Sequence, residues 1–295
     1  MPLALAIVGP TAAGKSLLAE QVSERRGDTE IVAVDAFTVY RGMDIGTAKP
    51  TVAARRAVRH HMLDVLEPEE AVSVQWFQGE ARAAIRDIHA RGKVPLLVGG
   101  SGLYFRAVVD DLRFPPTNAS VRARLEGDHA TNPAAAHRVL RAADPAAAER
   151  IDPNNLRRIV RALEVIELTG ERFSSFSDTW EEWKSIYDLQ AVRVNPADLD
   201  DRIERRTSAM LIAGLLDEAA GLHERRLSRT ARQAIGYAEA FAVLDGRADA
   251  RELHDVIARR TRRYARRQAS WFRRDERART VEPEDALATL VETPA

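Results

Sequence analysis

The 295-residue sequence contains no cysteine, and this absence removes several classes of protein from consideration. Without thiols there is no disulfide framework, no thiolate zinc site, no iron–sulfur cluster and no cysteine nucleophile. No apolar run approaches the length of about 20 residues that a membrane-spanning helix needs. The first residues also lack the charged segment of a secretory signal. We therefore expect a cytoplasmic protein with no membrane partner.

The sequence also has no excess of charge of either sign, and it contains little lysine. Lys+Arg and Asp+Glu both number 44, so overall charge does not predict a polyanionic partner. Arginine provides almost all of the positive charge, because lysine occurs only at positions 15, 49, 93 and 184. A lysine inside a motif is therefore conspicuous. The length allows a full α/β core and a second, smaller domain.

The most specific motif of the sequence lies close to its first residue. An unbroken apolar run, Leu3–Val8, is typical of a strand buried on both faces of a parallel sheet, and helical spacing of apolar residues follows Ser16. Between them stands a glycine-framed loop with the spacing of a P-loop: Gly9, Pro10, Thr11, Ala12, Ala13, Gly14, Lys15 and Ser16. Loop amides, the helix N-terminus and Lys15 would bind a di- or triphosphate, with the Ser16 hydroxyl placed to ligate Mg²⁺.

Two further buried strands are predicted at Ile31–Val34 and Val94–Val98, and each leads into polar residues. Ligands of open parallel sheets bind beyond the carboxyl ends of the strands. Asp35 stands at such an end, where it either faces the phosphate site or forms a local turn or cap. The third strand ends in Gly99-Gly100-Ser101 rather than in the acidic residue typical of hydrolytic P-loop proteins. The histidine pair at 60–61 has no third spaced ligand and favours a structural interpretation.

The segment 113–186 differs from the rest and predicts a small helical insertion domain within a core formed by 1–112 and 187–295. Its clearest helix is expected to begin with Asp152 as cap and Pro153 in the first turn, and to end at Gly170. The polar face of this helix carries Arg157, Arg158 and Arg161, which by default form a solvated surface. Aromatic residues at 173, 176, 180 and 183 are candidates for a small core. A strand over 187–194 should return the chain to the main sheet.

The last third of the sequence is rich in arginine. A long helix is expected over about 250–274, with aromatic residues among arginines that include Arg266 and Arg267. Such a helix is typical of a surface that binds nucleic acid or polyphosphate, and a salt-bridged structural helix is the alternative. The acidic tail after Thr280 is expected to be frayed. No coiled-coil pattern is present, which favours a monomer.

Several motifs, in order along nearly the whole chain, resemble those of the tRNA dimethylallyltransferases. They are Gly9 to Ser16, Asp35, Val39 to Pro50, His60-His61 with Asp64, Gly99 to Tyr104, Arg161 to Val165, Gln233 to Tyr237, and Arg267-Gln268 with Trp271 to Arg273. The resemblance implies an α/β fold with a P-loop NTPase-like core, a parallel sheet flanked by helices, and a helical insertion. It also implies transfer of a dimethylallyl group from dimethylallyl diphosphate to N6 of the adenosine 3′ of the anticodon, in tRNAs that read codons beginning with U.

The resemblance also assigns roles to residues. Asp35 would be the base that takes the proton of the amine, with Ser101 bonding the amine or the diphosphate. Lys15, the loop amides, Mg²⁺ on Ser16 and Arg206 would stabilise the leaving diphosphate. The tRNA would contact the residues Asp35, Ala36, Phe37, Thr38, Arg157, Arg158, Arg161, Gln233, Arg266 and Arg267, and the insertion would act as a clamp on the anticodon stem-loop.

Two positions depart from the family pattern. The family most often has serine after the aspartate, where this chain has Ala36, and usually threonine where it has Ser101. Three other functions stay open at this point: a small-molecule P-loop kinase, an enzyme that prenylates free adenine nucleotides, and a non-catalytic RNA-binding protein gated by nucleotide. Only the tRNA-modifying enzyme needs the phosphate loop, Asp35 and the basic helix together.

Overall fold

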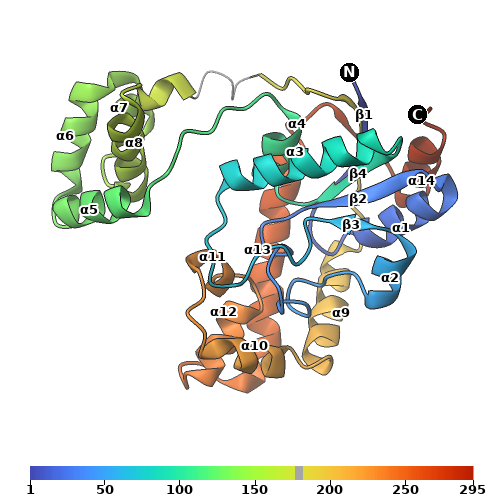
Figure 1. Ribbon diagram of the computed structural model, residues 1–295. Coiled ribbons are helices and arrows are strands. Elements are labelled where there is room, and N and C mark those ends of the chain that lie inside the picture. The colour runs from blue at the N-terminus through green and yellow to red at the C-terminus, as the bar shows by residue number, and fades with distance from the viewer. Residues whose placement is uncertain (177–181, 295) are drawn as a thin grey trace. The chain divides into compact units, whose positions relative to one another are not determined.

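The computed structural model describes residues 1–176 and 182–294, and it forms two compact units (Figure 1). The first unit contains Met1–Val109 and Ser185–Ala295, and the second contains Asp110–Lys184. The sequence placed these boundaries at 113 and 186. In the part of the chain that is described, no helix is both long and apolar enough to cross a membrane.

A six-stranded sheet forms the centre of the first unit, with the strand order β3-β2-β4-β1-β5-β6. Its strands are β1 Leu3–Val8, β2 Thr29–Val34, β3 His60–His61, β4 Val94–Gly99, β5 Asp188–Arg193 and β6 Ala278–Thr280. Every pair is parallel. The four longer strands confirm the predicted ones, including the strand that returns the chain to the sheet. The two edge strands were not predicted, because two or three residues are too few to show a period.

Helices pack against both faces of this sheet: α3 Val74–Ala90 on one, and α1 Lys15–Arg26 with α14 Pro283–Val291 on the other. The other helices of this unit are α2 Val52–Ala57, α4 Gly102–Val109, α9 Leu199–Ile212, α10 Leu215–His223, α11 Arg229–Arg232, α12 Tyr237–Leu244 and α13 Leu253–Phe272. Alternate residues of β1 serve opposite faces. Ala4 and Ala6 join the larger core with Phe77, whereas Leu5 and Ile7 pack in a second core. This alternation confirms the predicted α/β class with a doubly covered parallel sheet.

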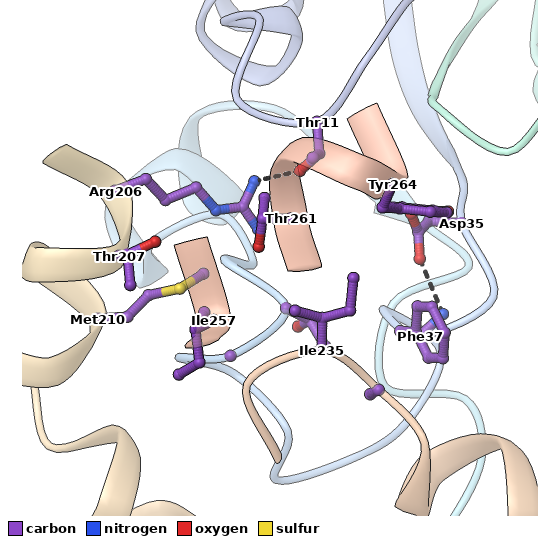
Figure 2. Close-up of a pocket in the computed structure, with 13 residues that line it drawn as sticks. Thr11, Asp35, Phe37, Arg206, Thr207, Met210, Ile235, Ile257, Thr261 and Tyr264 are labelled. Atoms are coloured by element: carbon purple, nitrogen blue, oxygen red, sulfur yellow. Dashed lines mark hydrogen bonds between the residues drawn. The ribbon is translucent and has the colours of Figure 1, made fainter. Parts of the chain in front are cut away.

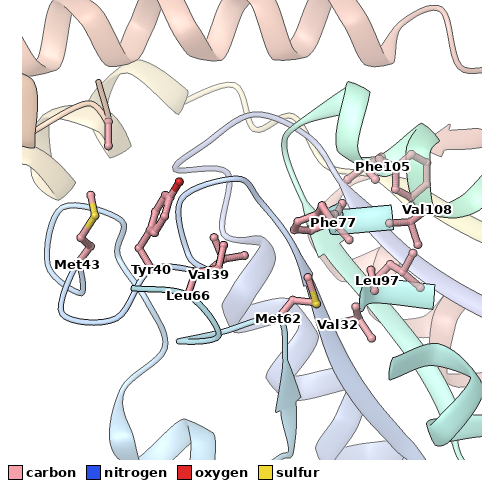
Figure 3. Packing of buried hydrophobic residues seen from close by; sticks show 14 of the residues in the cluster. Val32, Val39, Tyr40, Met43, Met62, Leu66, Phe77, Leu97, Phe105 and Val108 are labelled. Carbon is pink, nitrogen blue, oxygen red and sulfur yellow. The ribbon is translucent and has the colours of Figure 1, made fainter. Parts of the chain in front are cut away.

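The larger core extends from the sheet into the segment that follows β2 (Figure 3). Val39, Tyr40 and Met43 are completely buried although they lie in a loop. Figure 3 shows them on the segment that leads away from the Val32, Leu97 and Phe77 side chains. Burial of these three side chains anchors the segment after β2 to the larger core.

The expectation of a frayed tail after Thr280 is wrong. The helix α14 lies beside α1 (Figure 1), and its Ala286 and Leu290 are fully buried in the second core. The guanidinium of Arg26, at the end of α1, donates to the carbonyl oxygens of Leu290 at 3.0 Å and Thr293 at 2.6 Å. A short i, i+4 apolar pair within acidic sequence is too weak a signal to predict this packing.

The second unit is helical. Its helices are α5 Ala119–His129, α6 Pro133–Ala143, α7 Pro145–Arg150 and α8 Leu156–Thr169, followed by a short 3₁₀ turn over Phe173–Phe176. The predicted start of α8 is wrong: Asn155 is its N-cap and accepts from the Arg158 amide, whereas Asp152 accepts from the Asn154 amide in the preceding turn. Gly170 ends the helix in the left-handed conformation, with a φ of 69°, as predicted.

Aliphatic rather than aromatic residues form most of the core of this unit. Leu125, Leu140, Ile159 and Val160 are buried there. Of the four aromatic candidates, Phe176 is buried but not in this cluster, Phe173 packs against the aliphatic core, Trp183 is half-buried, and position 180 lies outside the described residues. The unit therefore has its own hydrophobic core, to which α5, α6, α7 and α8 all contribute.

Candidate active site

Three loops meet at the carboxyl edge of the sheet because their strands are neighbours. Val8 of β1 and Val34 of β2 both stand in register with Gly99 of β4. The phosphate loop, Asp35 and the loop after β4 therefore begin side by side. Gly99 must lack a side chain, because a Cβ there would lie 2.1 Å from the carbonyl oxygen of Val34.

The phosphate loop has the curled backbone that its sequence predicts. Gly9, Ala12 and Gly14 have positive φ angles of 144°, 64° and 89°. Gly14 precedes α1 and offers no side-chain cap, so the first amides of the helix are available to an anion. The ammonium of Lys15 donates to the carbonyl oxygen of Pro10 at 2.6 Å. A cation at a helix N-terminus is unfavourable without an anion, which indicates a loop built to receive one.

Burial and nearby charges tune the ionisable groups of this edge. Burial, with a further contribution from Arg206, lowers the pKa of Lys15 to about 8, against an opposing effect of Asp35. Burial raises the pKa of Asp35, while the Phe37 amide, Lys15 and Arg206 oppose that rise. Burial also lowers the pKa of Arg206. Two cations and one carboxylate therefore share a partly desolvated site, a pattern that is common in active sites.

Both sequence-based interpretations of Asp35 describe part of its environment. Its Oδ1 accepts a hydrogen bond of 2.8 Å from the Phe37 amide, which forms a local turn after β2. The same side chain lines two neighbouring pockets, one of which is shown in Figure 2. The turn fixes one carboxylate oxygen, and Asp35 also faces the space where a ligand would lie.

The two pockets differ in chemistry. The first is lined largely by apolar side chains, among them Phe37, Met210, Ile235 and Ile257 (Figure 2). The second contains the phosphate-loop residues Lys15 and Ser16 with Gly99 and Gly100. The side chains shared by both are Thr11, Asp35, Thr47 and Arg206. An anionic group in the second pocket and an apolar group in the first would thus both lie beside Asp35.

Arg206 and Gln268 bind opposite ends of Thr11. The guanidinium of Arg206, on α9, donates to Thr11 Oγ1 at 2.6 Å, and the Thr11 amide donates to Gln268 Oε1, on α13, at 2.8 Å. Arg206 was a predicted site residue, whereas Gln268 was not assigned a role. The available signal was its place beside Arg267 in one of the motifs that carry the family resemblance.

A half-buried glutamate holds the loop that carries Thr47. The carboxylate of Glu218, on α10, accepts from the amides of Asp44 at 3.0 Å, Ile45 at 3.0 Å and Gly46 at 3.4 Å, and from the Tyr237 hydroxyl at 2.5 Å. The Tyr237 ring lies so close to Gly46 that a Cβ would approach it to 2.4 Å. Neither Glu218 nor this contact was predicted, because both depend on residues about 170–190 positions apart.

Ser101, the predicted site residue in the loop after β4, differs in position from Gly99 and Gly100, which line the second pocket. Ser101 is half-buried and immediately precedes α4, where its carbonyl accepts from the Phe105 amide at 2.9 Å. It is not among the residues that line either pocket.

The histidine pair has structural partners: His61 Nε2 lies 2.7 Å from Glu30 Oε2, and His60 Nδ1 lies 2.8 Å from the Val58 carbonyl.

The residues after Asp35 divide between burial and the pockets. Ala36 is buried, Phe37 lines the first pocket and Thr38 lines the second. The Thr38 hydroxyl is buried and has no hydrogen-bond partner within the described chain. A buried hydroxyl without a partner is costly, so its position beside a pocket favours a ligand that bonds it.

The predicted RNA-contacting arginines of α8 are not equivalent. Arg157 and Arg158 are exposed. Arg161 is half-buried and donates to the carbonyl oxygens of Pro115 at 2.7 Å and Pro116 at 2.8 Å, and to Glu164. Arg161 thus anchors the segment before α5, and most of its donors are already used there.

The arginines of α13 also differ in their partners. Arg260 and Arg262 form ion pairs with Glu239 and Glu204. Arg266 and Arg267 are exposed, and the guanidinium of Arg267 lies 5.7 Å from the centre of the Tyr264 ring. Gln233 is also exposed, and its carbonyl accepts from Arg260 at 3.1 Å. Carboxylates therefore bind the first two arginines, whereas the second pair presents exposed cations further along the helix.

Together the fold and the site define a phosphate-loop protein of the α/β class with a carboxylate between a phosphate-binding and an apolar pocket. The family model described as IPP transferase matches residues 38–275. The tRNA dimethylallyltransferase of Parafrankia is 50% identical over 98% of this chain and 90% of its own length, and that of Nocardia farcinica is 49% identical over 97% and 92%.

Solved structures give the same result. The tRNA isopentenylpyrophosphate transferase of Bacillus halodurans has a TM-score of 0.70 and 38% identity, covering 98% of this chain and 94% of its own. A eukaryotic dimethylallyltransferase described as acting on tRNA has a TM-score of 0.82 and 26% identity, covering 96% and 74%. The chain belongs to the IPP transferase family.

Proposed function

We propose that this protein transfers the dimethylallyl group of dimethylallyl diphosphate to N6 of the adenosine 3′ of the anticodon, in tRNAs that read codons beginning with U. The names of its relatives support the class of reaction. The observation that carries the proposal is the position of Asp35, which lines both the phosphate-loop pocket and the apolar pocket. We place the reaction in the cytoplasm, with the chain acting as a monomer.

The phosphate loop binds the diphosphate of the donor. The amides that begin α1, the Lys15 ammonium and the Arg206 guanidinium supply positive charge in the same pocket. When the donor binds, the Lys15 ammonium gives up its hydrogen bond to the Pro10 carbonyl and donates to a phosphate oxygen instead. Charge that is already in place stabilises the diphosphate as it leaves, without reorganisation of water.

A divalent ion fits this pocket with few protein ligands. Ser16 is exposed at the first turn of α1 and lines the pocket with Lys15 and Asp35. Within the described residues no group of three His, Asp or Glu side chains could hold a metal. Mg²⁺ is commonly held by one or two protein oxygens together with substrate phosphates, so the Ser16 hydroxyl suits it. When bound, the ion would neutralise charge on the leaving diphosphate.

Asp35 acts as the general base. The N6 lone pair is delocalised into the purine, so the amine gains nucleophilicity when its proton is removed as the N–C bond forms. In the same step the C–O bond to diphosphate breaks, and the proton goes to the carboxylate. Burial raises the pKa of Asp35, which strengthens it as a base. The apolar side chains of the first pocket exclude water from the allylic carbon.

The acceptor nucleotide must leave its stack to reach this carboxylate. We infer that it lies against Ala36, Phe37 and Thr38, where the Thr38 hydroxyl bonds a polar group of the base. Ser101 bonds the amine or a diphosphate oxygen. The buried Thr38 hydroxyl and the ring of Phe37 at the first pocket support this placement.

The anticodon stem-loop binds to exposed cations. On the first unit these are Arg266 and Arg267, with Gln233 nearby, and on the helical unit they are Arg157 and Arg158. Arg161 contributes by fixing the segment before α5. Phosphate contacts of this kind dominate affinity for nucleic acid and depend on salt.

Labelled substrates separate this function from the alternatives. The protein is incubated with radiolabelled dimethylallyl diphosphate and unmodified tRNA, and separately with γ-labelled ATP and nucleosides. We expect label in tRNA and none transferred from ATP. Transfer from ATP without any label in tRNA would support a small-molecule kinase, and equal competition by AMP would support prenylation of free nucleotides.

A further inference from the structure

The inner face of α13 contacts two of the three loops at the carboxyl edge of the sheet. Gln268 is buried on this face, and its Oε1 accepts a hydrogen bond of 2.8 Å from the Thr11 amide of the phosphate loop. Its amide group also lies against the loop after β4, because a Cβ on Gly100 would approach Gln268 Nε2 to 2.3 Å. One side chain therefore touches both loops.

A second residue of the same helix continues this contact. The Trp271 ring lies against Gly102 so closely that a Cβ there would approach it to 2.1 Å. Ser101 stands between the two glycines that α13 contacts. The positions of Thr11 and Ser101 are thus both set by the helix rather than by their own strands alone.

Gln268 also changes which loop amides can bind phosphate. In phosphate loops the backbone amides point to the anion, but the Thr11 amide already donates to Gln268. The Thr11 hydroxyl accepts from Arg206 at 2.6 Å. Thr11 is consequently held at both ends, and the amides that bind the diphosphate are those at the start of α1.

We propose that Gln268 is a positioning residue for the diphosphate of the donor: it fixes the phosphate loop through the Thr11 amide and orders that loop before the donor binds. This inference rests on the proposed function for the identity of the donor. It assigns Gln268 no contact with the reacting atoms.

The test compares Gln268→Met, which keeps the volume and removes the acceptor, with Leu253→Ala. Leu253 is buried in the larger core at the other end of α13, so this control lowers stability without removing the Thr11–Gln268 hydrogen bond. Affinity for inorganic pyrophosphate with Mg²⁺ is measured by calorimetry without tRNA, together with KM for the donor and affinity for an anticodon stem-loop.

We expect Gln268→Met to weaken pyrophosphate binding and raise the donor KM by about tenfold, the effect of losing one buried hydrogen bond. Stem-loop affinity should stay within about twofold of wild type, and Leu253→Ala should change neither constant despite its lower Tm. Unchanged pyrophosphate affinity in Gln268→Met, or an equal loss in both variants, would overturn the inference. Failure of the wild type to modify tRNA would instead contradict the proposed function. The two results are distinguishable, because pyrophosphate affinity is measured without tRNA.

Discussion

The ammonium of Lys15 lies 2.6 Å from the carbonyl oxygen of Pro10, so the lysine of the phosphate loop is bonded to its own loop. This contact holds a positive charge in a site where burial already lowers the Lys15 pKa to about 8. The incoming diphosphate therefore meets a cation that is charged at neutral pH and loses its proton in mildly alkaline solution.

The first prediction concerns the pH dependence of donor use. As pH rises through about 8 the Lys15 ammonium is lost, so kcat/KM for the donor should fall about tenfold per pH unit above that value. The measurement is kcat/KM from pH 6 to 10 with saturating tRNA. Lys15→Arg is the control: it should be less active but keep no alkaline limb near pH 8, because arginine stays charged. A wild-type profile that is flat to pH 9.5 would contradict the assignment.

The same pKa has a consequence for stability. The pKa of Lys15 in the folded protein, about 8, is below the ordinary lysine value of 10.5, so between these values the unfolded chain binds more protons and stability rises with pH. Below about pH 8 the folded protein carries a desolvated charge. Lys15→Met should therefore raise Tm at pH 7 by a few degrees while donor binding is lost, and the gain should shrink at pH 10. A lower Tm at pH 7 would show that the charge is not destabilising.

Removal of the base should affect turnover rather than RNA binding. In Asp35→Asn the amide can still accept from the Phe37 amide, so the turn after β2 is retained, but proton transfer is lost. We expect kcat to fall by about 10²–10⁴. In the wild type, activity should fall as pH drops through the raised pKa of Asp35. Stem-loop affinity should be nearly unchanged, and full turnover by Asp35→Asn would argue for a non-catalytic protein.

Salt dependence should locate the RNA surface. The exposed Arg266 and Arg267 would each release about one counterion on binding phosphate, so Arg266→Ala should lower the slope of log K against log salt by about 1. Arg251→Ala is a matched control, since Arg251 is exposed but paired with Asp249 on a neighbouring turn. Titrations of a labelled stem-loop at several salt concentrations give both slopes. Equal slopes in all three proteins would place the RNA elsewhere.

The last helix should contribute to the stability of the first unit. Leu290 is fully buried between α14 and α1, so Leu290→Ala should lower the free energy of unfolding by about 2–5 kcal/mol. Ile212→Ala, at a side chain that is 88% exposed, should change it by less than about 0.5 kcal/mol. Urea unfolding followed by circular dichroism measures both. A negligible effect of Leu290→Ala would mean that α14 is not packed in solution.

Features encoded in short continuous segments could be predicted from the sequence. The phosphate loop, Asp35 and the four longer strands depend on neighbours within a few residues, and Arg206 followed from the family resemblance. Gln268 and Glu218 could not be predicted in their roles, because each acts on a loop that lies far away in the sequence. No sequence period distinguishes the buried Gln268 or the half-buried Glu218 from an exposed polar residue.

The ends of helices and the exposure of individual arginines were also hard to predict from the sequence. Asp152 and Asn155 are both good helix caps, and only the packing of the whole unit selects Asn155. Arg161 has the same side chain as Arg157, yet two carbonyl oxygens and Glu164 bind it. Arginine on a helix predicts a polar face, but the partners of each guanidinium come from elements that the local sequence does not include.

The hydrogen bond between Thr11 and Gln268 joins residues 257 positions apart. During synthesis the phosphate loop appears long before its support, so the chain cannot hold its donor until α13 has docked. Closing a loop of this length costs entropy, so a contact this distant forms slowly in folding. A transient release of one helix would therefore disable donor binding while the sheet beneath it stays folded.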